Sequence, residues 1–129
     1  MDKGKARLQS IFKFKCPRCL GSKLFETKMY QLGTLGKMKD RCPHCSENFM
    51  PEPGFYFGAM YVSYALITGQ FIVLFTLLHL LGLEWEIWEF ISFFVVILVI
   101  LAPINFRLSR VIWLNIFVSY DNRYDEMLK

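Results

Sequence analysis

Two four-residue units of the form Cys-Pro-X-Cys, CPRC at residues 16–19 and CPHC at residues 42–45, decide how the N-terminal part of this chain folds. They contain all four cysteines of the chain, and 22 residues separate them. Two residues between thiolates let a tight turn direct both sulfurs at one metal ion, and a second such turn completes a tetrahedral set. The pattern therefore predicts a structural zinc (Zn2+) site with four ligands: Cys16, Cys19, Cys42 and Cys45.

Other chemistries are open to the same four thiols. Rubredoxin-like iron, a redox-active dithiol and a ribbon that binds no metal also satisfy the spacing. Two paired units favour a metal over a redox dithiol, because one unit suffices for redox chemistry. Four thiolates leave no position for a catalytic water, so we expect the metal to stabilise the fold. We expect His44, inside the second unit, to be an exposed residue and not a ligand.

The region around the cysteines, residues 1–53, is basic, with eleven Lys and Arg against five Asp and Glu in a chain of net charge +4. So small a unit buries little apolar surface, and a bound metal would supply much of its folding free energy. We expect a small apolar cap beside the metal, formed by Leu24, Phe25, Tyr30 and Phe49. A basic ribbon also suits nucleic acid, but positive charge is equally expected beside anionic lipid, and we favour lipid.

Two uncharged blocks follow this basic head. The first, FYFGAMYVSYALITGQFIVLFTLLHLLGL, covers residues 55–83, and the second, FISFFVVILVILAPINF, covers residues 90–106. About 20 apolar residues in a helix cross a bilayer core, so the first block predicts a transmembrane helix. The shorter second block predicts either a full span or a re-entrant or interfacial helix. The short link between them, which carries Glu84, Glu86 and Glu89, predicts an antiparallel hairpin with a solvated loop. Pro103 is expected either to kink the second helix or to mark its exit from the membrane.

Basic residues indicate how the hairpin is oriented. The loop between the blocks has no Lys or Arg, whereas basic residues lie just before the first block and just after the second. Lys and Arg near the ends of spans favour the cytoplasmic side. We therefore expect both termini in the cytoplasm, on the evidence of these five residues: Lys37, Lys39, Arg41, Arg107 and Arg110.

The first block contains candidates for contact with another helix. Small residues four positions apart allow close helix approach, and a mid-membrane amide usually faces a helix because lipid leaves it unsatisfied. The amide of Gln70 either joins the two helices of the hairpin or docks into a larger complex. A single histidine near the outer end favours an interfacial or helix contact over a haem or metal ligand. The candidates are Ala59, Ser63, Ala65, Gly69, Gln70 and His79.

The run CPHCSENFMPEPGFYFGAMYVSYA, residues 42–65, resembles a family of small bacterial inner-membrane proteins, domain of unknown function 983. The likeness extends over about residues 12–106. The residue after each unit is often Gly in such knuckles, whereas here it is Leu20 and Ser46, and Gly21 is expected to take over the first turn. The resemblance implies a place in the bacterial inner membrane and a role beside a terminal cytochrome oxidase.

Together these features predict a membrane protein with a small zinc-ribbon-like N-terminal head (residues 1–53), a two-helix transmembrane hairpin (residues 54–106) and a short C-terminal helical tail (residues 107–129). The hairpin helices are expected at about 55–81 and 87–106, with a loop at 82–89. The sequence shows no phosphate-binding loop, no pair of catalytic carboxylates and no nucleophile–base set. We therefore do not expect this protein to be an enzyme. We expect a membrane adaptor within a larger complex, with a copper- or zinc-handling protein or a membrane-tethered nucleic-acid binder as alternatives.

Overall fold

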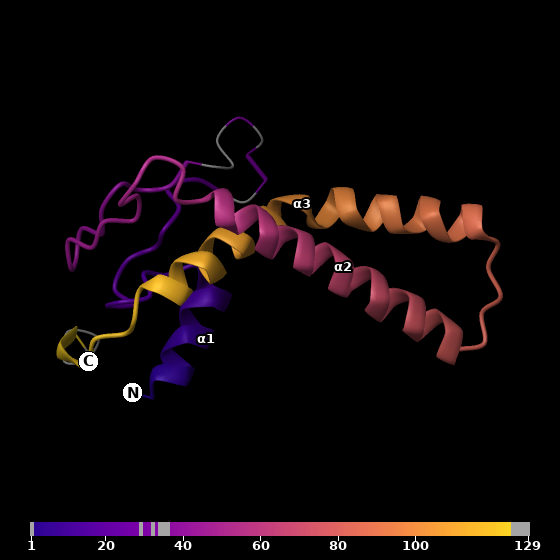
Figure 1. The fold of residues 1–129 in the computed structure, drawn as a ribbon, viewed down its shortest axis with the longest axis horizontal. Helices are drawn as coiled ribbons and strands as arrows, with labels where there is room; N and C mark the ends of the chain where they lie inside the picture. The colour runs from indigo at the N-terminus through magenta and orange to yellow at the C-terminus, as the bar shows by residue number, and fades with distance from the viewer. Residues whose placement is uncertain (1, 29, 32, 34–36, 125–129) are drawn as a thin grey trace.

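The structure, a computed structural model, describes residues 2–28, 30, 31, 33 and 37–124. Three α-helices, α1 (Lys3–Lys13), α2 (Phe57–Leu80) and α3 (Ile87–Phe117), precede the short 3₁₀ helix η2 (Asn122–Tyr124). α2 and α3 form a hairpin that projects to one side, while α1, the cysteine units and η2 gather at its other end (Figure 1). We call this second part the head.

The hairpin helices lie close to the predicted positions. α2 and α3 are long and apolar enough to cross a membrane, and 0% and 6% of their most apolar stretches are buried within the chain. α2 ends in a Schellman motif, because Gly82 adopts φ 70° and its N–H donates to the His79 carbonyl while the Leu83 N–H donates to the Leu78 carbonyl. α3 begins at Ile87, where the second helix was predicted to start, so the link is shorter than the predicted loop.

Phenylalanine side chains join α2 to α3 near the link between the two helices. The ring of Phe71 lies edge-on to Phe90 and Phe94, with centroids 5.4 and 5.2 Å apart, and Phe75 approaches Phe90 at 5.8 Å. Edge-to-face pairs of this kind stabilise a contact beyond the area that they bury. The two helices are thus held together by large rings at this end, with small residues playing no part in these contacts.

The helix α3 continues well beyond the predicted second span. It runs without interruption through Pro103 to Phe117, so residues 107–117 continue the same helix. Proline has no N–H for the helix ladder and its ring crowds the preceding turn, which bends a helix. Figure 1 shows this change of direction between the part of α3 beside α2 and the part beside α1. The bend turns the C-terminal part of α3 into the head.

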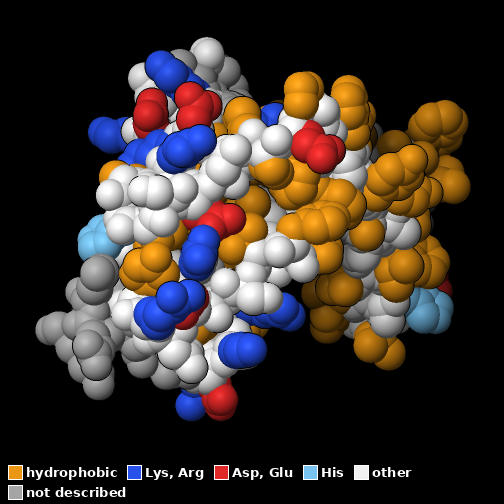
Figure 2. All heavy atoms as spheres, turned by 60° about the vertical axis from the view of Figure 1, so that its left-hand side comes forward, with side chains coloured by type: hydrophobic (Ala, Val, Ile, Leu, Met, Phe, Trp, Pro, Cys, Tyr) orange, Lys and Arg blue, Asp and Glu red, His pale blue; other side chains and the backbone are white. Residues whose placement is uncertain are grey.

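The core of the head contains residues from both ends of the chain. Leu24, Phe25 and Phe49 are buried there, as predicted, together with Val111 and Leu114 of α3. The expectation for Tyr30 is wrong, because its side chain is 63% exposed. Aromatic character alone does not bury a residue that the backbone turns outward. Space-filling spheres show the charged side chains gathered over the head and the hydrophobic ones over the hairpin (Figure 2).

Candidate metal centre

The four cysteine sulfurs converge on one point in the head. Their Sγ atoms all lie within 4.8 Å of one another. The Cys16–Cys45 pair is 3.8 Å apart and the Cys19–Cys42 pair is 3.6 Å apart. A tetrahedron with metal–sulfur bonds of about 2.3 Å has edges of about 3.8 Å, whereas a disulfide needs about 2.05 Å. The thiols are free, and their spacing fits one tetrahedral metal ion.

Each Cys-Pro-X-Cys unit forms the same turn. The Leu20 N–H donates to the Cys16 carbonyl at 3.0 Å, and the Ser46 N–H donates to the Cys42 carbonyl at 2.9 Å. Leu20 and Ser46 adopt the left-handed conformation, with φ of 54° and 57°. The expectation that Gly21 takes over the first turn is wrong, because Leu20 itself has the positive φ. A metal ion bound at both ends of the turn would offset the strain of a left-handed Leu.

Short antiparallel pairings hold the two turns beside each other. Lys15 pairs with Lys23 around the first turn and Arg41 pairs with Asn48 around the second. A third pairing, between Phe25 and Met38, joins the two halves. Among the described residues these are isolated bridges and not full strands, which agrees with a zinc-ribbon-like head of minimal size. A bound metal ion would add cohesion to such a frame.

Hydrogen-bond donors surround two of the sulfurs. The Ser22 hydroxyl lies 3.0 Å from Cys42 Sγ, and the Gly21 N–H donates to Cys19 Sγ at 3.4 Å. Burial opposes ionisation of Cys42, but the Ser22 hydroxyl and backbone N–H groups outweigh it and lower the pKa of the thiol to about 7. Burial raises the pKa of Cys45 to about 12. Of these two thiols, Cys42 therefore loses its proton to a binding metal ion more easily than Cys45.

His44 is exposed, as predicted, and lies outside the four-sulfur group. Its ring instead covers Gly21, where an added Cβ would lie 2.9 Å from the ring carbons. The second turn thus packs on the first through this contact. The interpretation of His44 as a surface residue of the knuckle is consistent with that position.

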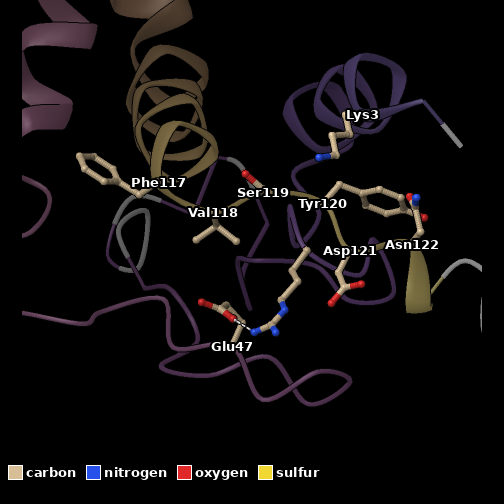
Figure 3. A pocket seen from close by; sticks show the side chains of 9 residues that line it. Lys3, Glu47, Phe117, Val118, Ser119, Tyr120, Asp121 and Asn122 are labelled. Atoms are coloured by element: carbon tan, nitrogen blue, oxygen red, sulfur yellow. Dashed lines mark hydrogen bonds and ion pairs between the residues drawn. The ribbon is translucent and has the colours of Figure 1, made fainter.

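An ion pair between Arg18 and Glu47 links the two cysteine units on the outside of the head. The Arg18 carbonyl also accepts a hydrogen bond from the Asp121 N–H, at 3.2 Å. These groups line a hollow of about 510 Å³ together with Lys3 and Tyr120, and Figure 3 shows Glu47 with the dashed line of its ion pair. The segment after α3 is therefore fastened to the first cysteine unit.

Gln70 faces the other helix of its own hairpin. Its side-chain amide donates to Asn105 Oδ1 at 2.7 Å and accepts from Asn105 Nδ2 at 3.1 Å. Of the two alternatives for this amide, the structure shows the hairpin contact. Both polar groups of each side chain are satisfied, which is the arrangement that a low-dielectric setting requires.

The remaining contact candidates lie in different surroundings. Ala59 is buried and Ser63 is half-buried, whereas Ala65 and Gly69 are exposed. Ala65 and Gly69 line an apolar hollow of about 480 Å³ on the hairpin, and an added Cβ at Gly69 would meet nothing within 4 Å. His79 is exposed, with its ring parallel to Phe75 at 6.5 Å, and lines a second hollow near the link. The structure thus leaves the Ala65–Gly69 surface open.

Sequence reasoning missed a close approach of the two helices, between Gly58 and Trp113. An added Cβ at Gly58 would lie 2.0 Å from the Trp113 ring, whose Nε1 donates to the Phe55 carbonyl at 2.8 Å. Asn105 was also missed, although a lone amide in an apolar run is a recognisable signal for a helix contact. Nothing in the spacing of small residues singles out Gly58, because its partner lies 55 positions away.

Comparison with protein families gives one match. The model of a family described as "Protein of unknown function (DUF983)" matches residues 33–117. The matched region contains the second cysteine unit, both hairpin helices and the whole extension of α3, and it begins after the first cysteine unit. No match was found among curated proteins. None was found among solved structures.

Proposed function

This chain belongs to the DUF983 family, and on that premise we propose that it is a non-enzymatic membrane adaptor whose cytoplasmic head is built around a structural zinc ion. One observation carries the proposal: four sulfurs at tetrahedral spacing share a core with Val111 and Leu114, residues of a helix that also forms the apolar hairpin. The metal site therefore serves to join a rigid head to an anchor.

The ligand set supports a structural and not a catalytic ion. Four thiolates complete a tetrahedral zinc shell, which leaves no position for a reacting water or a substrate atom. Three of the four cysteines are buried, so the site has little access to solvent. Zinc also has no redox chemistry, which suits a site whose task is cohesion. The residues that would hold the ion are Cys16, Cys19, Cys42 and Cys45.

The exposed side chains of the hairpin support insertion into a membrane. Large apolar groups such as Tyr61, Val99 and Leu80 face outward along α2 and α3, and water would make that surface costly. Basic residues at the head end and an acidic link favour a cytoplasmic head. α1 and η2 both lie at that same end (Figure 1), as two spans with both termini inside require.

The partner that we propose is another membrane protein, and the apolar hollow at Ala65 and Gly69 is the surface that it would contact. Small residues let a second helix approach closely, and here no side chain among the described residues occupies the space. The family resemblance implies a respiratory cytochrome oxidase of the bacterial inner membrane as the complex, with this chain as an accessory or assembly subunit.

Purification of the tagged full chain in a mild detergent tests this function. We expect about one zinc per chain by elemental mass spectrometry and oxidase subunits among the co-purifying proteins. Gly69→Trp fills the open hollow and should reduce recovery of those subunits severalfold, whereas Val99→Trp, at an exposed site on α3, should not. Metal-free protein with oxidised thiols, or recovery of the chain alone, would contradict the proposal.

A second candidate, a metal-handling protein, is favoured by one observation. Cys45 is only half-buried, which gives an incoming ligand access to one sulfur. A carrier would exchange zinc or copper within minutes and keep its fold, whereas a structural site loses metal slowly and unfolds as it does so. Chelator-induced metal release followed in parallel with protease sensitivity of the head separates the two functions.

A further inference from the structure

A basic hollow separate from the metal centre lies where the head meets the hairpin. It occupies about 340 Å³ between the end of α1, the segment that leaves the first cysteine unit, and α3. Four cationic side chains and one carboxylate line it, and these are Lys13, Lys23, Lys28, Arg107 and Glu26. Such an excess of positive charge in a concave site favours an anionic ligand.

Arg107 lies at the base of this hollow and is only partly satisfied. Its side chain is 5% exposed, and one terminal nitrogen, Nη2, donates to Thr27 Oγ1 at 3.2 Å and to the Lys28 carbonyl at 2.9 Å. The guanidinium stacks over Phe25 at 4.7 Å. Its Nε is buried without a hydrogen-bond partner, and within the described residues no carboxylate pairs with it. A buried charge without a counter-ion is costly, so this arrangement calls for an anion.

The position of the hollow indicates what the anion is. Arg107 directly follows the uncharged run 90–106, so it lies at the level of lipid headgroups if the hairpin lies in a bilayer. A phosphate group offers several acceptor oxygens to ammonium and guanidinium donors together. We propose that this hollow binds a phosphate group at the inner membrane surface. The inference rests on the proposed function only in that the hairpin is membrane-inserted.

Lipid binding to the purified full chain in a neutral detergent tests the inference. The probes are short-chain phosphatidylglycerol, short-chain phosphatidylcholine and inorganic phosphate, and the readout is native mass spectrometry of the bound species. We expect saturable binding of phosphatidylglycerol that Lys23→Gln/Lys28→Gln weakens about tenfold or more. The matched control Lys5→Gln/Lys37→Gln removes the same charge from exposed sites outside the hollow and should change binding less than twofold.

The outcomes distinguish a lipid headgroup from free phosphate, and they distinguish failure of this inference from failure of the proposed function. Binding of phosphatidylglycerol alone assigns a lipid headgroup, and equal binding of inorganic phosphate assigns a free anion, provided that both depend on Lys23 and Lys28. If both double variants lose phosphatidylglycerol binding equally, the binding depends on general surface charge, and the inference is overturned. Arg107→Gln should abolish binding while the zinc content stays at wild-type level. Carbonate extraction of membranes reports insertion separately, so a failure of the anchor is distinguishable.

Discussion

The head and the hairpin differ in where their apolar side chains lie. Leu20, Leu24 and Phe49 of the head are fully buried, although the head has few such residues. The hairpin has many more, and most of them are exposed. The head therefore buries an apolar core, but only a small one. The hairpin has a large apolar surface and buries little of it within the chain. A bound metal ion would compensate for the first shortage, and a lipid bilayer would compensate for the second.

The two regions meet in one helix. α3 contacts α2 through Phe90 and Phe94, bends at Pro103, and then contributes Val111 and Leu114 to the head. The Asn115 amide donates to Ser10 Oγ at 3.1 Å and so fastens α1 to the same helix. A rigid shared helix couples the orientation of the head to that of the hairpin. Four experiments test how far the regions depend on each other and on their different sources of stability.

The largest effect should follow loss of the metal. Cys19→Ser removes one thiolate, and a structural zinc site contributes about 10–16 kcal/mol, which is as much as a small domain's whole stability. We expect the head to become protease-sensitive while the hairpin keeps its helical circular dichroism signal. His44→Ala, which changes the other cysteine unit without removing a ligand, should leave the head resistant. A head that stays resistant in the Cys19→Ser variant would show that the metal is dispensable.

Leu114→Ala should weaken the junction of the two regions next most strongly. Leu114 is fully buried in the core that includes the cysteines, and truncation of a buried Leu costs about 2–5 kcal/mol. Thermal unfolding of the zinc-loaded protein, monitored by release of zinc to a dye, measures the change. Ile116→Ala, at a neighbouring site that is 59% exposed, is the control. Equal shifts for the two variants would mean that α3 does not form part of the head's core.

Two glycines of α2 give a matched pair for the helix crossing. Gly58→Ala places a methyl group against the Trp113 ring, whereas Gly69→Ala meets nothing. Forced overpacking costs about 1–3 kcal/mol, while Gly→Ala in an open helix position stabilises by up to about 1 kcal/mol. Unfolding in detergent should thus shift in opposite directions for these variants. Destabilisation by both would point to glycine itself and not to the Trp113 contact.

The smallest effect belongs to the amide pair inside the hairpin. Gln70 and Asn105 exchange two hydrogen bonds, and such pairs between membrane helices contribute about 0.6–2 kcal/mol. A double-mutant cycle with Gln70→Leu and Asn105→Leu should give a coupling energy in that range. Zinc content should not change in any of the three variants. A coupling near zero would assign Gln70 to an external partner.

Local patterns account for what could be predicted. The approach of Cys16, Cys19, Cys42 and Cys45 depends on two short turns, and that prediction is confirmed because turn geometry depends on neighbouring residues. The error at Gly21 arose because glycine is the usual left-handed residue, whereas closure of the turn imposes that conformation on Leu20. The two apolar helices could also be predicted from the sequence, because length and hydropathy are properties of a single segment.

What the sequence determined by itself is therefore the set of parts: a four-thiolate site, two apolar helices and the family to which they belong. Only the tertiary structure decided that α3 passes from one region into the other, that Gly58 meets Trp113, and that the buried Arg107 shares a hollow with three lysines. These features join residues more than 50 positions apart. No local periodicity encodes such contacts, because they depend on the angle at which a bent helix meets a small core.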